Sequence, residues 1–188
     1  LCGDRIGKQD QYAAAFGGIN FYEFMKDGRV RVEALWNRVT DLQELFDSGV
    51  LYWTGVQRRA EDVLGEQQKN IPFQIEALKE MTDLANSCRL SFLNSENLIG
   101  DIASIVNQGW ARKRNYASTI SSSTLEDGIT RAIAAGAHGA KIAGAGGGGF
   151  LYVLASDRDK ESVTKALSPM TPVGFQYCQF GSKVLTAI

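Results

Sequence analysis

The stretch HGAKIAGAGGGGFLYVLAS, residues 138–156, places five glycines in the six positions 144–149, between two apolar segments. The residues after the glycines are aliphatic and aromatic, which predicts a strand over 149–155, and the residues before them predict another strand. Glycine loses more conformational entropy on folding than any other residue. We therefore expect the backbone of this loop to approach a ligand or another backbone closely, and a plain hairpin with positive φ angles is the alternative.

The glycine loop does not fit either common nucleotide-binding signature. A dinucleotide fingerprint needs a helix directly after its glycines, so that the helix N-terminus faces the pyrophosphate. Here the strand-like sequence FLYVLA, 150–155, follows instead. A P-loop needs Gly-Lys-Ser/Thr after the glycines, and none is present.

Working outward from the loop, the sequence predicts alternating strands and helices. We expect a long helix with Pro72 in its first turn, a helix that begins at Ser123 with Glu126 completing a capping box, and a helix capped by Asp157. The other expected elements are a helix over 8–17, a hairpin over 19–34, a buried strand over 50–56, a helix over 58–68, a helix with apolar positions from Leu98 to Trp110, and a final strand over 173–180.

This order predicts an α+β fold, with a small antiparallel, ferredoxin-like sheet and helices on one of its faces. The unit begins near residue 48. Residues 1–47 fit it poorly and are interpreted as the trailing part of a preceding domain, a helix and a hairpin. Residues 48–188 are interpreted as a complete second domain.

The segment GKQDQYAAAFGG, residues 7–18, places a polar cluster at the start of a helix. Asp10 in the first turn could simply interact favourably with the helix dipole. The same position would keep the carboxylate ionised and fixed in direction, so that it could accept a proton from a substrate hydroxyl. The spacing leaves both interpretations open.

Composition excludes several classes of protein. The 188 residues are 44% hydrophobic and carry a formal net charge of −1, so no polyanion-binding surface is indicated and nucleic acid is not expected as a partner. The three cysteines, Cys2, Cys88 and Cys178, lack metal-binding or disulfide-framework spacing. No targeting or membrane-spanning segment is evident, and a cytoplasmic location fits best.

Two segments together resemble a known superfamily. GKQDQYAAAFGGINFYEF, 7–24, followed by GAKIAGAGGGGFLYVLA, 139–155, is similar to the GHMP kinases, which include galactokinase and mevalonate kinase. Within them, LYWTGVQRRAEDVL, 51–64, and NQGWARKRNYASTIS, 107–121, resemble sugar kinases of the D-glycero-D-manno-heptose 7-phosphate kinase type.

The resemblance implies roles for particular residues. Asp10 matches the catalytic aspartate that activates or orients a sugar hydroxyl. Gly7, Lys8 and Gln11 would line the sugar pocket. The loop that supports the nucleotide phosphates would be Gly144, Ala145, Gly146, Gly147 and Gly148. Lys113 and Arg114, like Arg58 and Arg59, could meet a substrate phosphate, but we favour a solvated surface for them.

The resemblance also implies that the substrates are ATP and a sugar or sugar phosphate, with Mg²⁺ as a cofactor. The superfamily's phosphate-binding motif, Pro-x-x-x-Gly-Leu-x-Ser-Ser, would precede Leu1, as would most of the side chains that bind Mg²⁺. No metal ligand is therefore assigned in this chain, which we expect to be inactive alone. Apolar surface left exposed could drive association into a homo-oligomer.

Two other functions stay open at this point. The acceptor could be fucose or galactose instead of a heptose 7-phosphate. The chain could also be a non-enzymatic ferredoxin-like module that binds a small ligand, although such a module has no use for the Asp10 cluster.

Overall fold

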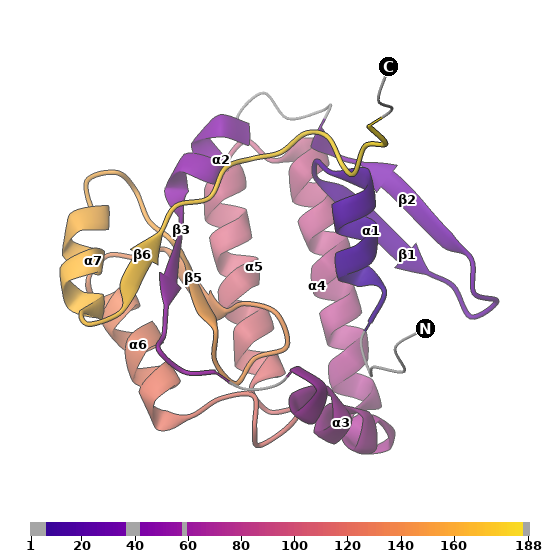
Figure 1. Cartoon of the computed structure of the whole chain (residues 1–188), viewed down its shortest axis with the longest axis horizontal. Coiled ribbons are helices and arrows are strands. Elements are labelled where there is room, and N and C mark those ends of the chain that lie inside the picture. The colour runs from indigo at the N-terminus through magenta and orange to yellow at the C-terminus, as the bar shows by residue number, and fades with distance from the viewer. Residues whose placement is uncertain (1–6, 37–41, 58–59, 186–188) are drawn as a thin grey trace.

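A four-stranded antiparallel sheet forms the centre of the molecule, whose computed structural model describes residues 7–36, 42–57 and 60–185 (Figure 1). The strand order is β4-β5-β3-β6. The strands are β3 (Gly49–Trp53), β4 (Gly139–Ile142), β5 (Phe150–Leu154) and β6 (Thr171–Val173). Leu151 lies opposite both Tyr52 and Ile142, so β5 is paired on both sides. The two strands expected around the glycine loop are therefore neighbours in the sheet.

The helices between the strands give the sheet its ferredoxin-like connectivity. Helices α6 (Ser123–Ala134) and α7 (Lys160–Leu167) lie side by side on one face (Figure 1). Their Leu125, Val163 and Leu167 are buried with Leu151 and Val153 of β5 in one apolar cluster. The predicted α+β class, with an antiparallel sheet and a helical layer, is confirmed.

A second apolar cluster lies on the other side of β5, because successive side chains of a strand point to opposite faces. Leu154 joins it, together with Phe92 and Ile102. The latter two come from the long helices α4 (Ile75–Asn94) and α5 (Leu98–Lys113), which pack against each other. Helix α5 also reaches the first cluster through Trp110, so it connects the two parts of the core.

The first described elements are α1 (Gln9–Phe16), β1 (Asn20–Phe24), β2 (Val30–Ala34) and α2 (Leu42–Ser48). Phe21 of β1 and Leu45 of α2 join this second cluster, whereas α1 has no buried residue and packs on the hairpin. The expected hairpin is confirmed, with Phe24 opposite Val30. An Arg89–Glu33 pair with contacts of 2.7 and 3.0 Å joins α4 to β2.

Two expected helix starts are wrong, and α6 begins at Ser123 as expected but with a different cap. Helix α3 (Ala60–Asn70) is followed by a separate 3₁₀ turn (Ile71–Phe73) that contains Pro72, and α4 begins only after it. Ser122, whose backbone is extended, caps α6 by accepting a bond from the Leu125 amide, in place of Ser123. Asp157 pairs with Lys160 at 2.7 Å, and the turn 157–159 delays the start of α7 to residue 160.

The expected final strand over 173–180 is also wrong. Strand β6 ends at Val173, and the chain then crosses α2 toward α1 (Figure 1). Phe175 and Tyr177 lie two residues apart, as they would in a strand, but both rings pack against Phe46 of α2 and neither residue belongs to the sheet. Farther on, the Gly18 amide donates to the Cys178 carbonyl at 2.8 Å. We call residues 174–185 the C-terminal tail.

Candidate functional site

Helix α1 presents Asp10 as an exposed carboxylate in its first turn. Within the described part of the chain, no residue forms a hydrogen bond or ion pair with this side chain. The helix has eight residues and none is buried, so packing from outside must hold it in place. Tyr12 and Phe16 supply that packing through ring contacts with Tyr22 of the hairpin.

The neighbours of Asp10 divide into two groups. Gly7 and Lys8 line a hollow of about 400 Å³ against the turn of the hairpin, beside Phe24 and Arg29. The Gln11 side chain turns back on its own helix, where its amide nitrogen lies 2.8 Å from the Gly7 carbonyl oxygen and 3.2 Å from that of Lys8. Their substrate-binding roles stay predictions, and Gln11 has a structural role in this conformation.

The glycine loop packs tightly against two other segments. The Gly147 amide donates to the Ile120 carbonyl at 2.6 Å, and the Gly149 amide donates to the Val56 carbonyl at 2.8 Å. Gly148 has φ = +151°, and a Cβ there would lie 2.5 Å from the Val56 oxygen. Glycine is needed here because a side chain would collide with neighbouring backbone. The expected close approach of backbones is therefore confirmed.

Two acceptors of the loop are held by side chains from helices. The Gly144 carbonyl accepts a hydrogen bond from the Lys113 ammonium of α5, and the Ala145 carbonyl accepts one from Gln67 of α3 at 3.4 Å. No described residue accepts a bond from the Ala145 or Gly146 amide. These amides stay free to donate to another group, and the role of Gly144, Ala145, Gly146, Gly147 and Gly148 beside a nucleotide stays a prediction.

Glu66 fixes the segment on which the glycine loop rests. Its carboxylate accepts bonds from the Ser118 amide at 2.8 Å and the Thr119 hydroxyl at 2.5 Å, and further bonds come from the Ser118 hydroxyl and the Thr119 amide. These donors, led by the Thr119 hydroxyl, lower the pKa of Glu66 to about 2. Because Ile120 comes next in the chain, this contact positions the carbonyl that the loop binds.

A cavity of about 450 Å³ lies between α4, α5 and β4, with Gln9 of α1 at its edge. Lys113 and Lys141 line it, and we call it the lysine cavity. Burial, followed by the charge of Lys141, lowers the pKa of Lys113 to about 8, and burial also lowers the pKa of Lys141. In the part of the chain that the structure describes, neither lysine has a carboxylate partner.

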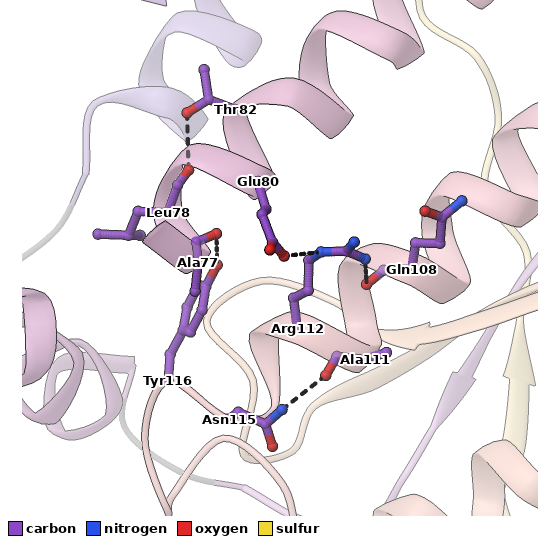
Figure 2. A network of polar contacts seen from close by, with 9 residues as sticks. All are labelled: Ala77, Leu78, Glu80, Thr82, Gln108, Ala111, Arg112, Asn115 and Tyr116. Atoms are coloured by element: carbon purple, nitrogen blue, oxygen red, sulfur yellow. Dashed lines mark hydrogen bonds and ion pairs between the residues drawn. The ribbon is translucent and has the colours of Figure 1, made fainter. Parts of the chain in front are cut away.

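Polar contacts join α4 to the end of α5 and the turn that follows it (Figure 2). Arg112 pairs with Glu80 at 2.7 Å and also donates to the Gln108 carbonyl at 3.2 Å. The Tyr116 hydroxyl donates to the Ala77 carbonyl at 2.7 Å. Arg112, directly before Lys113, and Tyr116, three residues after it, are thus fixed to α4, and the Lys113 ammonium is directed at the glycine loop.

The structure separates the remaining cationic candidates. Arg114 pairs with Glu126 at 2.9 Å, which gives it a structural role. Arg58 and Arg59 lie outside the described residues. Lys113 is half-buried and bonded, so the expectation of a solvated helix end is wrong for this residue.

Sequence reasoning missed Lys141 and Glu66. The signal for Lys141 was a single charge in the short strand GAKI, where the residues on both sides, Ala140 and Ile142, are fully buried. A charged residue between two core positions faces the opposite side of the sheet. The signal for Glu66 is weaker, because its partners are 52 and 53 residues away in the sequence.

No group of three or more His, Cys, Asp or Glu side chains in the described ranges is placed to hold a metal ion. The described residues therefore offer no fit for Mg²⁺, and we assign it no ligand here. None of the described helices has the length and apolar character to span a membrane. Cys88 and Cys178 are free thiols.

Comparison with known proteins assigns the chain to a class of small-molecule kinases. The profile of the family described as GHMP kinases C terminal matches residues 74–169, which is half of the chain. The chain belongs to the GHMP kinase family and carries its C-terminal domain.

Individual relatives agree with this assignment. The D-glycero-alpha-D-manno-heptose 7-phosphate kinase of Campylobacter jejuni is 33% identical over 168 residues, which cover 86% of this chain and 48% of the relative. The crystal structure of a D-glycero-D-manno-heptose 1-phosphate kinase from Bacteroides thetaiotaomicron has a TM-score of 0.62 at 27% identity and covers 96% of this chain and 50% of that one.

A more distant structure shows the fold alone. The galactokinase of Lactococcus lactis, in complex with galactose, has a TM-score of 0.68 at 16% identity, with 97% of this chain and 57% of that chain covered. The chain spans about half the length of the heptose kinases it matches.

Proposed function

We propose that this chain provides the acceptor side of an ATP-dependent sugar kinase, and that the acceptor is the anomeric hydroxyl of a heptose 7-phosphate. The observation that carries the proposal is Asp10, an exposed and unpaired carboxylate in the first turn of α1, next to Gln9 at the edge of the lysine cavity. The heptose specificity is supported by the name of the Campylobacter relative.

The proposed reaction is an in-line phosphoryl transfer. The acceptor oxygen attacks the γ-phosphorus of ATP, a new P–O bond forms, and the bond from this phosphorus to the β,γ-bridging oxygen breaks. ADP leaves with the electron pair of that bond. The proton of the attacking hydroxyl passes to the Asp10 carboxylate and from there to solvent.

The glycine loop supports the donor side of the proposal. The free amides of Ala145 and Gly146 could donate to a phosphate oxygen or to a loop that holds one. Tight packing on Val56 and Ile120 would keep these amides oriented before ATP arrives, so little reorganisation would be needed during transfer. We further propose the division of the chain at residues 47 and 48, which falls at the end of α2.

The test is Asp10→Asn in the natural protein, with ADP release measured for heptose 7-phosphate, unphosphorylated heptose, fucose and galactose. We expect kcat to fall by about 10²–10⁴-fold, because a positioned general base contributes that much. Asp83→Asn, which removes an exposed carboxylate on α4, is the control and should leave kcat unchanged. An unchanged kcat for Asp10→Asn would remove Asp10 from the chemistry.

A further inference from the structure

The lysine cavity has the size and polarity of a site for a small anion attached to a larger molecule. Its volume of about 450 Å³ lies within the range of small-molecule sites. Aliphatic and sulfur-containing side chains of α4 and α5, such as Met81, Leu84 and Val106, form most of its wall. Against this apolar wall, its two ammonium groups are the strongest binding groups.

The charges of the cavity are unbalanced. Among the described residues that line it there is no Asp or Glu, and besides Lys113 the titratable neighbour of Lys141 is the Cys88 thiol, whose pKa burial raises. Two half-buried cations without an acid partner are unfavourable for a folded protein. An anion between them would offset that cost, so the cavity is more favourable when an anion occupies it.

The cavity is also placed next to the proposed reaction. Gln9 borders it, and Asp10 is the next residue of α1, directed about 100° farther round the helix. A sugar phosphate could therefore extend from the cavity past Gln9 to the Asp10 carboxylate. Its phosphate and its anomeric hydroxyl would lie at opposite ends of the bound molecule.

We propose that the lysine cavity binds the phosphate group of the acceptor, with Lys141 and Lys113 as the donors. This inference rests on the proposed function, and it explains how the enzyme would select a sugar phosphate over a free sugar. Lys113 keeps its bond to the Gly144 carbonyl and uses its remaining N–H groups for the phosphate. Lys141 has no hydrogen-bond partner among the described residues, so all three of its N–H groups are available.

The γ-phosphate of ATP is the other source of the same chemistry. The acceptor is favoured because Asp10, which would meet the acceptor hydroxyl, follows directly after Gln9 at the cavity edge. The glycine loop turns a carbonyl, not an amide, toward Lys113. A carbonyl oxygen would repel a nucleotide phosphate at this point.

The experiment is calorimetric titration of the 188-residue chain and its variants with heptose 7-phosphate, unphosphorylated heptose, inorganic phosphate and ATP. We expect wild type to bind heptose 7-phosphate at least tenfold more tightly than heptose. Lys141→Met should remove this difference, since a charge-assisted hydrogen bond contributes enough for a tenfold change. Lys141→Arg should restore part of the difference in affinity. Lys113→Met should also weaken the binding of heptose 7-phosphate.

Controls make each outcome decisive. Lys165→Met removes an exposed lysine on α7 and should leave all four affinities unchanged. Melting temperatures show whether each variant is folded, and Lys141→Arg keeps the charge if the methionine variant is unstable. Equal binding of heptose 7-phosphate and heptose by wild type, or loss of ATP affinity alone in Lys141→Met, would overturn the proposal.

The proposal and the proposed function can fail separately. If binding of heptose 7-phosphate depends on Lys141 but the natural protein transfers no phosphoryl group, the phosphate-site proposal stands and the proposed kinase function is wrong. If the natural protein phosphorylates unphosphorylated sugars, and wild type and Lys141→Met do so with the same kcat/KM, the kinase function stands and the phosphate-site proposal is wrong.

Discussion

The Lys113 ammonium donates a hydrogen bond to the carbonyl oxygen of Gly144, so the last turn of α5 holds the first residue of the glycine loop. The same lysine lines the cavity that Gln9 borders. One side chain thus contacts both candidate halves of the site, the loop associated with the nucleotide and the cavity proposed for the acceptor. A substitution or a bound ligand at either half should therefore change the pKa of Lys113.

Lys113 should make stability depend on pH in the alkaline range. Its pKa is about 8 in the folded chain and 10.5 in the absence of burial. Between these values the unfolded chain binds more protons, so the free energy of unfolding should rise as pH increases from about 8 to 10.5. Urea unfolding across this range should show a steeper rise for wild type than for Lys113→Met.

Lys141 and Cys88 are titratable neighbours in the same cavity and are present in both proteins, so they largely cancel in this comparison. A difference between the two proteins that stays constant from pH 7 to 10.5 would contradict the assignment. Saturating heptose 7-phosphate should reduce the pH dependence, because a bound anion raises the pKa of a nearby ammonium.

Gly148→Ala should destabilise the chain more than Gly144→Ala. At Gly148 the new Cβ would lie 2.5 Å from the Val56 oxygen at φ = +151°, whereas Gly144, at φ = +65°, has no atom within 4 Å of that position. We expect a cost of about 3 kcal/mol or more for Gly148→Ala and about 1–2 kcal/mol for Gly144→Ala. Chemical denaturation measures both, and equal costs would show that the Val56 contact does not restrict the loop.

Glu66→Gln should weaken the support of the glycine loop and make the chain less sensitive to acid. The pKa of Glu66 is about 2 in the folded chain and 4.5 in its reference state, so the unfolded chain binds more protons between these values. The stability that Glu66 provides is present above pH 4.5 and lost as pH falls toward 2. Melting temperatures from pH 7 to 2 should fall more steeply in wild type than in Glu66→Gln.

Glu161→Gln is the matched control for this experiment, because Glu161 is an exposed acid on α7 whose ion pair with Lys165 is open to solvent. Its melting curve should follow that of wild type. If Glu66→Gln has the same melting temperature as wild type at pH 7, the bonds to Ser118 and Thr119 do not support the fold.

Gly181→Ala should release α1 while leaving the core intact. A Cβ at Gly181 would overlap the Ala15 carbonyl, whereas Gly174, also in the C-terminal tail, has open space around it. We expect amide hydrogen exchange over residues 12–16 to accelerate at least tenfold in Gly181→Ala, the factor that corresponds to about 1.4 kcal/mol. Gly174→Ala should exchange like wild type, and equal rates in all three proteins would show that the tail does not hold the helix.

Local patterns were sufficient for much of the fold. Five glycines between two apolar runs predicted the β4–β5 connection, and the spacing of apolar residues predicted α4 and α5. They were insufficient where two environments satisfy the same pattern. The alternation around Phe175 and Tyr177 suits a strand, but it suits packing on Phe46 equally well, and only the position of α2 decides between them.

The candidate site shows the same limit. Asp10 could be chosen as a candidate from the sequence because its carboxylate lies at the start of a helix. The family match confirms membership of the superfamily in which such an aspartate is expected. The single charge in GAKI marked Lys141 as facing away from the first cluster, but its burial could not be predicted, because it arises from α4 and α5 closing over β4. The partnership of Lys113 with Gly144 likewise joins residues 31 positions apart and leaves no local trace.

The contact between the C-terminal tail and α1 also fixes an order of events during protein synthesis. The Ser182 amide donates to the Ala14 carbonyl at 3.0 Å, and these residues are separated by 168 positions. Helix α1 leaves the ribosome long before its partner has been made, and eight residues are too few for a stable helix alone. The ring contacts of Tyr12 and Phe16 with the hairpin can form early, but the bond between Ala14 and Ser182 can form only after the tail has been translated, so nascent chains that stall earlier would hold α1 through the hairpin alone.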